Sequence, residues 1–469
     1  MRDRPAPAQV VATAAAAVLT AVPAAYSQPL EAIDAEFFVT PRSTPLHVFA
    51  DPARPDEVYI VQQAGLIDAH DRVSGAFIRN VLDIRTRVIA SGEQGLIGAA
   101  LHPAGDRLAV HYTRPDLETA PPNDSFTRVS VFPYDSATGD ADESDGMEDV
   151  VIEIDQPFTN HNAGWIGFGP LDGYLYIPTG DGGSGADPGD RAQNPNNLLG
   201  KVLRLDIESD AFPPADDFQN YAIPEDNPFV GTTDGLEEIW SLGLRNPYRA
   251  DFDRLTGGFF MVDVGQDTRE EVNYEPPNSP GEVNYGWRCR EGLLPFISSA
   301  FGCDTDDFTD PVFDVDQDTG ACSIAGVAVY RGDRLNGFDG RYFFGDLCAS
   351  DIWSVGINPD GSADVVNHTD ELRPAVAGGV ISGGTDAHGD VYIGTFVGIY
   401  RIIRDDGRCN PADLAEPLGV LSQLDVDAFV TSFFAGEADA AALANPFDLV
   451  SQLDVVEFVR LFFAGCPAN

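Results

Sequence analysis

A histidine and an aspartate on either side of a predicted β-hairpin are the residues whose types and spacing best suit acid–base chemistry. Two apolar runs, 165–169 and 174–178, flank the turn-forming letters PLDG at 170–173. Antiparallel pairing about this turn joins residues whose numbers sum to about 343, which places His161 opposite Asp181 or its neighbour. A carboxylate that orients an imidazole is the arrangement of a general base. The alternative is a structural histidine and an aspartate that caps a loop.

The hairpin is one of a series of similar β units along the chain. A short apolar strand, a polar turn and a second strand with a large side chain recur at intervals of about 50 to 70 residues. About six such units predict small sheets stacked radially, an all-β fold of the six-bladed β-propeller type, which binds ligands near its central channel. A β-helix is the rival, but its repeats are far shorter. The units are 46–60, 95–111, 161–180, 239–262, 325–345 and 380–394.

The charge balance excludes several classes of partner. The 469 residues include 28 Lys and Arg against 75 Asp and Glu, a net charge of −47. Such a field repels the phosphates of nucleic acids and of anionic membranes, so neither is expected as a partner. Hydrophobic residues make up 43% of the chain, enough for a large core. Lys201 is the only lysine, so a mechanism that needs a lysine has one candidate.

Residues 1–27 have the pattern of a secretory signal peptide. Two arginines precede an apolar run at 10–22, and the letters AYS at 25–27 form a small-x-small cleavage site. The mature chain is therefore expected to begin near Gln28 and to be secreted, to the periplasm or the cell surface. An uncleaved anchor is the alternative, although the run is short for a bilayer. No other segment of the sequence predicts a membrane span.

Six cysteines, an even number in a chain predicted to be exported, indicate disulfide bonds. No Cys-x-x-Cys motif occurs, so a cysteine-based metal or redox site is not expected. The spacing suggests three local pairs, which are Cys289–Cys303, Cys322–Cys348 and Cys409–Cys466.

Several further motifs resemble the glucose/sorbosone dehydrogenase family. They occur in the right order and cover residues 35–404, which makes the set far more specific than any one motif. The resemblance implies a six-bladed β-propeller, and the characterised enzymes of the family use pyrroloquinoline quinone (PQQ) to oxidise aldoses. The matching segments are GEQGLIGAALHP (92–103), NHNAGWIGFGPLDGYLYIPTGDGG (160–183), GKVLRLDI (200–207), SLGLRNPYR (241–249), DVGQDTREEVNY (263–274) and NYGWRCREG (284–292).

The resemblance assigns roles to residues of the hairpin and of the LRNP motif. His161 matches the family's catalytic base, which removes the proton of the sugar C1 hydroxyl as hydride passes to the quinone, and Asp181 matches the carboxylate that orients it. Arg245 and Asn246 match residues that contact the quinone, where Arg245 would stabilise negative charge as the cofactor is reduced. From the residues alone, Arg245 could instead form a salt bridge between blades. Glu93 stands where the family has a polar residue, often Gln, near the quinone.

A calcium ion beside the cofactor is also implied by the resemblance. Its ligands would be the carbonyl oxygens of Gly265 and Gln266 and an acidic side chain, Glu270, because hard oxygen ligands suit calcium. The alternative is that this acidic stretch is a solvated turn.

Two segments depart from the pattern of the proven enzymes. Those enzymes hold the carboxylates of PQQ with a lysine late in the propeller and an arginine pair in the last blade. Here the corresponding segments, FFGDLCASDIW (343–353) and GGVISGGTDAHGDVYI (378–393), contain neither lysine nor arginine. Both resemble instead the hedgehog-interacting-protein-like branch of the family. A second hypothesis is therefore a non-catalytic extracellular propeller that binds a glycan or a protein.

The composition changes after residue 404, where a tail with a different pattern begins. Two similar segments start at Ser422 and Ser451, with apolar residues at helical spacing and a final glycine. A hydrophobic helix pair is favoured over a calcium loop from 413 to 425, because Ala415 and Pro417 occupy ligand positions. Residues 409–469 resemble the GC-type dockerin-like domains, which implies docking to another extracellular component.

Overall fold

The chain is almost entirely β-structure in the part that the computed structural model describes, which is residues 29–115, 125–144, 146–212, 219–305 and 307–405. In those ranges the helical elements are α1 (Thr369–Leu372) and the 3₁₀ turn η1 (Gln317–Thr319). No helix within them is long and apolar enough to cross a membrane. The predicted signal peptide at 1–27, the predicted tail domain at 409–469 and the predicted Cys409–Cys466 disulfide lie outside the described residues.

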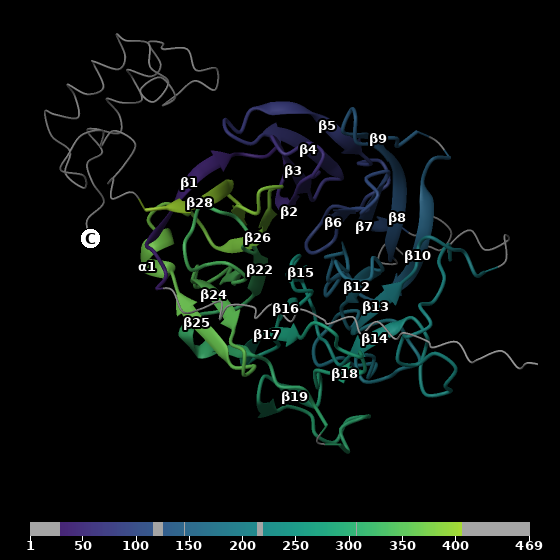
Figure 1. Ribbon diagram of the computed structural model, residues 1–469. Coiled ribbons are helices and arrows are strands. Elements are labelled where there is room, and N and C mark those ends of the chain that lie inside the picture. Colours follow the sequence, from purple (N-terminus) through teal and green to yellow (C-terminus); the bar gives the residue numbers. More distant parts are fainter. Residues whose placement is uncertain (1–28, 116–124, 145, 213–218, 306, 406–469) are drawn as a thin grey trace, which may run out of the picture.

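An eight-stranded sheet joins the two ends of the described chain. Its first strand pairs antiparallel with its last one in sequence, and the two lie side by side in Figure 1. The middle of this sheet is a single parallel pairing of Val48 with Gly384. A side chain at Gly384 would lie 1.7 Å from the carbonyl oxygen of Val48, so only glycine allows the contact. The strand order is β1 (Ile33–Val39), β28 (Ile399–Arg404), β27 (Val391–Thr395), β26 (Val380–Thr385), β2 (Pro45–Phe49), β3 (Glu57–Gln62), β4 (Leu66–Asp71) and β5 (Phe77–Asp83).

The other large sheets follow one another around a common centre (Figure 1), with β6, β15 and β22 nearest to it. Successive strands within each sheet run antiparallel, apart from a short parallel pairing of β14 with β18. Among the described residues the sheets contain β6 (Leu96–Leu101), β7 (Arg107–Pro115), β8 (Ser125–Asp135), β9 (Asp140–Ala141) and β10 (Asp149–Gln156); then β11 (Gly167–Phe168), β12 (Leu175–Thr179), β13 (Lys201–Leu205), β14 (Ile239–Leu242) and β18 (Val283–Asn284); then β15 (Arg249–Phe252), β16 (Phe259–Asp263), β17 (Arg269–Glu275) and β21 (Phe313–Asp316); then β22 (Ile324–Val329), β23 (Tyr342–Asp346), β24 (Ile352–Ile357) and β25 (Ala363–Asn367); with a short ribbon of β19 (Arg290–Glu291) and β20 (Leu294–Pro295).

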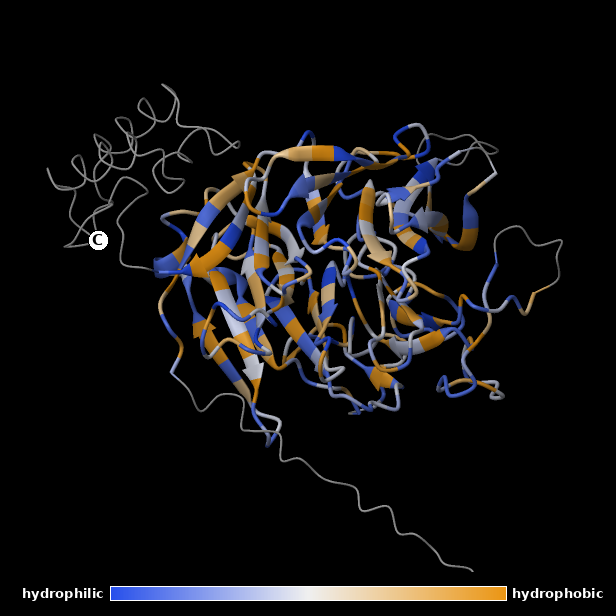
Figure 2. Cartoon of the chain, turned by 45° about the horizontal axis from the view of Figure 1, so that its top comes forward, coloured by the Kyte–Doolittle hydropathy of each residue, from blue (hydrophilic) through white to orange (hydrophobic). Residues whose placement is uncertain are grey.

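The hydrophobic core lies in layers between neighbouring sheets. Val61 of β3 and Ile67 of β4 pack with Leu108 and Val110 of β7 in the neighbouring sheet. Similar clusters fill the junctions between the other sheets. Figure 2 shows hydrophobic residues along most of the strands. Strands such as β3 and β22 are buried along their whole length, because both faces of each sheet are covered. This explains why the sequence shows continuous apolar runs instead of strict alternation.

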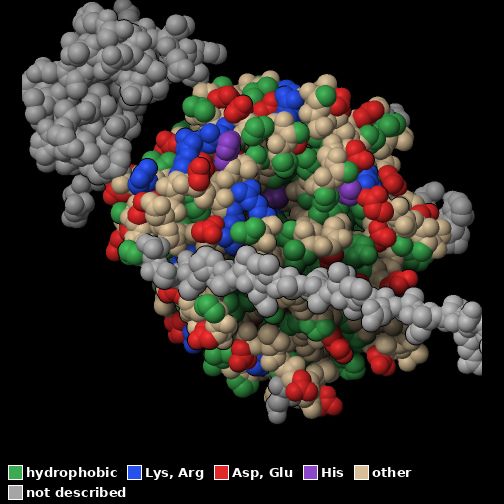
Figure 3. All heavy atoms as spheres, in the orientation of Figure 1, with side chains coloured by type: hydrophobic (Ala, Val, Ile, Leu, Met, Phe, Trp, Pro, Cys, Tyr) green, Lys and Arg blue, Asp and Glu red, His purple; other side chains and the backbone are tan. Residues whose placement is uncertain are grey.

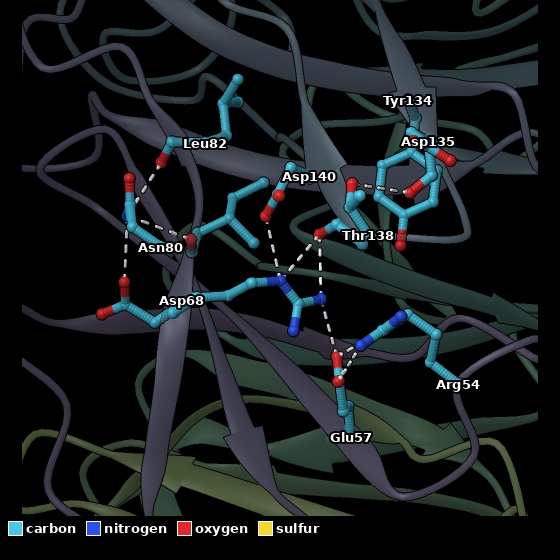
Figure 4. Close-up of polar contacts among 12 residues, drawn as sticks. Arg54, Glu57, Asp68, Asn80, Leu82, Tyr134, Asp135, Thr138 and Asp140 are labelled. Atoms are coloured by element: carbon cyan, nitrogen blue, oxygen red, sulfur yellow. Dashed lines mark hydrogen bonds and ion pairs between the residues drawn. The ribbon is translucent and has the colours of Figure 1, made fainter.

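Ion pairs reinforce the junction between the sheet that contains β3 to β5 and the neighbouring strands β8 and β9. The carboxylate of Glu57 contacts Arg54 at 2.6 Å and Arg79 at 2.7 Å, and Arg79 also contacts Asp140 of β9 at 3.0 Å. Figure 4 shows Glu57 at the start of β3, Arg54 in the turn before it and Asp140 of β9 close together. Burial acts to raise the pKa of Glu57, but hydrogen bonds from Arg54 and Arg79 lower it to about 2. Glu57 therefore stays ionised at neutral pH, and Arg79 connects it to Asp140 of β9.

The predicted hairpin forms in the predicted register, with a shorter first strand. Gly167 pairs with Tyr176 and Phe168 with Leu175. The expectation of a strand over 165–169 is wrong in its length, since β11 has only two residues. Just before it the backbone takes left-handed angles, with φ of 56° at His161, 52° at Ala163 and 131° at Gly164, which extended strands do not adopt.

Two disulfides are present among the described residues, and both are pairs that the spacing suggested. Cys289 is bonded to Cys303 and Cys322 to Cys348. The second one ties the segment before β22 to the turn between β23 and β24, next to the centre of the ring.

Candidate functional site

The imidazole of His161 and the carboxylate of Asp181 meet at the open end of the hairpin. Nδ1 of His161 lies 2.7 Å from Oδ1 of Asp181, and the two side chains are 5% and 0% exposed. Their approach depends on Gly180, where a Cβ would lie 2.0 Å from the carbonyl oxygen of His161. The structure thus brings together the pair that the hairpin register placed opposite each other.

Further donors fix the Asp181 carboxylate in place. Its Oδ1 also accepts the N–H of Gly183 at 2.9 Å, and its Oδ2 accepts the indole N–H of Trp287 at 2.9 Å. Because a carboxylate only accepts, Nδ1 of a neutral His161 carries the proton and Nε2 keeps a lone pair. Within the described ranges Nε2 has no hydrogen-bond partner, so it can accept a proton from a bound hydroxyl.

Arg245 lies beside this pair without a carboxylate partner of its own. Its Nη1 donates to the carbonyl of Val264 at 2.8 Å and its Nη2 to Gln266 at 3.3 Å, and its guanidinium lies 5.5 Å from the ring centre of Trp287. The salt bridge that was the alternative for Arg245 is not formed with any described residue. The result is a buried positive charge next to the Trp287 ring and the His161–Asp181 pair.

Glu93 and Asn246 support the left-handed segment that carries His161. Oε2 of Glu93 accepts the backbone N–H of His161 at 2.6 Å and the side-chain N–H of Asn246 at 3.2 Å. The amide oxygen of Asn246 accepts the N–H of Ala163 at 3.0 Å. Both residues therefore lie beside His161 and hold the backbone of this segment, and their contact with a quinone stays a prediction.

Asp263 holds the backbone of the LRNP motif. It accepts the backbone N–H groups of Arg245 and Asn246 at 2.8 and 2.6 Å. Burial raises the pKa of Asp263 to about 7, although these hydrogen bonds oppose the shift. The motif is thereby held by a carboxylate from the end of β16.

Glu291 organises the loop that begins at Gly265, a role that the sequence did not reveal. Its Oε1 accepts four consecutive backbone N–H groups, of residues 266 to 269, at 2.6, 2.8, 2.9 and 3.2 Å. Burial acts to raise the pKa of Glu291, but these bonds and that of Thr268 lower it. Glu291 and Trp287 both lie in the NYGWRCREG motif, which was quoted for the resemblance without a role for either side chain.

Glu270 points into the protein and anchors the next sheet. Its Oε2 accepts the N–H groups of Gly265 at 3.2 Å and Ile324 at 3.1 Å, and its Oε1 accepts the amide of Gln317 at 2.7 Å. The side chain is fully buried, and burial raises its pKa. The alternative of a solvated acidic turn is therefore wrong for Glu270. Three N–H donors surround the carboxylate that calcium would need, so in this arrangement Glu270 does not fit a calcium site.

The two segments that lack the expected cations lie against each other. Asp346 accepts the backbone N–H groups of Cys322, Ser323, Cys348 and Ala349 at 2.7 to 3.0 Å. A Cβ at Gly379 would lie 1.8 Å from the carbonyl oxygen of Leu347. An acidic side chain and tight backbone packing thus occupy the turn whose sequence lacks the lysine of the proven enzymes.

Lys201 holds the glycine-rich loop that follows Asp181. Its ammonium group donates to the carbonyl oxygens of Arg191, Ala192 and Leu199 at 2.8, 3.1 and 2.7 Å. The side chain is fully buried, and this burial lowers its pKa to about 7, with Asp187 opposing the shift. The single lysine is therefore a structural clamp behind the loop.

Comparisons with known proteins identify relatives of this chain. The HIPL1 protein of Arabidopsis thaliana is 39% identical over 293 residues, which are 55% of this chain and 41% of that protein. Hedgehog-interacting protein of Mus musculus is 30% identical over 206 residues, 42% of this chain and 28% of that protein. The chain thus spans less than half the length of these relatives.

The chain also resembles a solved structure and matches a family model. The PQQ-bound form of aldose sugar dehydrogenase from Streptomyces coelicolor has a TM-score of 0.56 and 23% identity, covering 80% of this chain and 98% of that one; this likeness concerns the all-β fold. The family model described as Glucose / Sorbosone dehydrogenase matches residues 52–377. Since that match spans well over half of the chain, we conclude that the protein belongs to the Glucose / Sorbosone dehydrogenase family.

Proposed function

We propose that this protein is an oxidoreductase that oxidises the C1 hydroxyl of an aldose, with hydride transfer to PQQ, on a six-bladed propeller. The observation that carries the proposal is the buried His161–Asp181 pair, in which Nε2 of His161 is unengaged. A base in this state takes the hydroxyl proton while C1 loses its hydride.

Each residue of the site has a defined part in this reaction. Nε2 of His161 receives the proton, and Asp181 stabilises the imidazolium that results. Trp287 keeps the carboxylate aligned through its 2.9 Å hydrogen bond. Burial of the pair strengthens these electrostatic effects by excluding water. PQQ, when bound, supplies the hydride acceptor, and Arg245 is placed to face negative charge in the cavity.

The residues around His161 suit contact with the quinone of PQQ better than contact with its carboxylates. Arg245 offers a buried guanidinium with no described carboxylate partner, and its Nε is without a hydrogen bond. Glu93 places a carboxylate at the same site, and Asp346 stands in the turn that lacks the family's lysine. Each lost charge-assisted contact costs about 1.5–3 kcal/mol, so PQQ is expected to bind, but more weakly than to enzymes that keep these cations.

The proposed function also includes calcium binding, secretion and docking. The proposed calcium ligands are the carbonyl oxygens of Gly265 and Gln266 without Glu270, whose carboxylate is engaged by three N–H donors. The two disulfides suit an oxidising compartment, in agreement with secretion to the periplasm or cell surface. Residues 409–469 would dock the protein to an extracellular component, and the net charge of −47 argues against nucleic acid as a partner.

The second candidate function is a non-catalytic propeller that binds a glycan or a protein. It is favoured by the absence of lysine and arginine from 343–353 and 378–393, and by the similarity to hedgehog-interacting protein. Direct binding of PQQ discriminates between the two, because the second candidate needs no quinone.

The test combines turnover with binding. The mature full-length protein is incubated with PQQ and calcium, then with a panel of aldoses and an artificial electron acceptor. We expect turnover that His161→Ala abolishes and that the control His388→Ala, at an exposed histidine, retains. Calorimetry with PQQ alone is expected to show binding at micromolar affinity or tighter. Absence of both PQQ binding and His161-dependent turnover would refute the proposal and favour the binding propeller.

A further inference from the structure

A positive charge is buried at the centre of the ring without a counter-ion. Arg249, the first residue of β15, is 1% exposed. Its Nη1 donates to the carbonyl of Tyr248 at 3.3 Å, whereas its Nε and Nη2 have no hydrogen-bond partner. Arg249 forms no ion pair with any described residue, and Asp251, two positions further along β15, accepts the N–H of Val329 instead. Arginine does not lose its proton in proteins, so this charge persists.

Three other sheets contribute buried polar groups without a hydrogen bond whose electrostatics are coupled to Arg249. Both ring nitrogens of His111 on β7, Nδ1 of His47 on β2 and the hydroxyl of Tyr342 on β23 are buried without a hydrogen bond. His111 and Tyr342 are 0% exposed. Such groups are rarely left unpaired in native proteins, because each loses its hydration without replacement. Unpaired groups that all feel the charge of one arginine are consistent with a ligand between them.

Tyr342 and Arg249 approach each other over Gly326. A Cβ at Gly326 of β22 would lie 1.9 Å from the hydroxyl of Tyr342 and 2.9 Å from Cβ of Arg249. Glycine at this position therefore lets the tyrosine and the arginine approach the same point. Figure 3 shows basic side chains near the centre of one face, whereas Arg249, His111 and Tyr342 are buried beneath the surface.

The protonation states leave one cation and a set of neutral donors. Burial, together with the neighbouring Arg249, lowers the pKa of His47 and of His111 to about 3. Burial raises the pKa of Tyr342 well above its usual value. At neutral pH the cluster is therefore Arg249 with its free N–H groups, one N–H of His111 and the O–H of Tyr342, which is a donor set for an anion. Nδ1 of His47 is left as an acceptor that a water molecule beside the anion can satisfy.

We propose that the centre of the propeller binds one small monovalent anion, a halide or a small carboxylate, between Arg249, His111 and Tyr342. A small ion is required because the surrounding side chains are almost fully buried. Since these side chains come from different sheets, the bound anion fastens the blades together at the axis. This site is separate from the proposed oxidation chemistry, because none of its members contacts His161 or Asp181.

The first experiment measures thermal unfolding of the full chain. Sodium bromide, sodium formate and sodium gluconate are compared at equal ionic strength. Bromide and formate are expected to raise Tm by about 4 °C with saturation, while gluconate, which is too large, has no such effect. Equal protection by all three salts would mean that only screening is at work, and protection by gluconate alone would require a larger ligand; either result overturns the proposal.

Variants and diffraction locate the site. Arg249→Met is expected to lose the saturable bromide effect, whereas Arg341→Met retains it, because Arg341 is a buried arginine already paired with Asp364 at 2.6 Å. Crystals of the wild-type protein grown in bromide need no variant to fold. An anomalous bromide peak within hydrogen-bonding distance of the Arg249 guanidinium supports the proposal, and the absence of a peak there refutes it.

Discussion

The indole N–H of Trp287 donates a 2.9 Å hydrogen bond to Oδ2 of Asp181, the carboxylate whose other oxygen holds His161. A residue 106 positions away in the sequence thus aligns the carboxylate behind the proposed base. The relationship extends the site beyond the hairpin to the loop between β18 and β19.

Replacing Trp287 by phenylalanine tests this alignment. The substitution keeps an aromatic ring but removes the donor to Asp181, so we expect kcat for aldose oxidation to fall about tenfold. The downfield Nδ1 proton resonance of His161 should shift as well, which is a readout independent of turnover. Trp353→Phe, in the sheet of β22 to β25, serves as the control. Unchanged kinetics together with an unshifted resonance would show that Trp287 only fills space.

Glu93→Gln probes the charge beside the cofactor cavity. Glutamine can accept the same hydrogen bonds from His161 and Asn246 but carries no charge. Removing one negative charge near an anionic quinone is expected to tighten PQQ binding about tenfold, or ~1.4 kcal/mol. Calorimetry measures the change, and Asp135→Asn at the exposed end of β8 is the control. An equal or weaker affinity of Glu93→Gln would contradict the electrostatic explanation.

Lys201 predicts a specific dependence of stability on pH. Its pKa is about 7 in the folded protein and 10.5 in the unfolded reference, so between these values the unfolded chain binds more protons. The free energy of unfolding should therefore rise with pH across this window, by at most about 1.4 kcal/mol per pH unit. Urea unfolding of wild type and Lys201→Met at pH 7, 8 and 9 isolates the contribution. Parallel curves for the two proteins would rule it out.

The two disulfides are expected to contribute unequally to stability. Cys322–Cys348 spans 26 positions and Cys289–Cys303 spans 14. In the chain-entropy description the longer loop stabilises by about 3.5 kcal/mol and the shorter by about 3 kcal/mol. Denaturant unfolding of the double serine variants measures both losses. A larger loss at Cys289–Cys303 would indicate that local packing outweighs loop length at these positions.

The sequence was sufficient for the features that depend on local turn chemistry. The letters PLDG set the hairpin register, and that register placed His161 opposite Asp181, as the structure has them. Trp287 and Glu291 could not be assigned from local patterns, because their partners lie in distant parts of the chain. The inward direction of Glu270 follows from the neighbouring sheet, whose N–H of Ile324 it accepts. Arg249 received no role from the sequence, because its position at the centre depends on how the sheets are arranged.

The pairing of β1 with β28 also determines when the fold can be completed. The ring closes only when residues 33–39 meet residues 399–404, so nearly the entire described chain must be synthesised before the last sheet has its outer strand. Contacts this distant in sequence make folding slow. Pairing of β1 with β28 is therefore among the latest steps of folding that the order of synthesis permits.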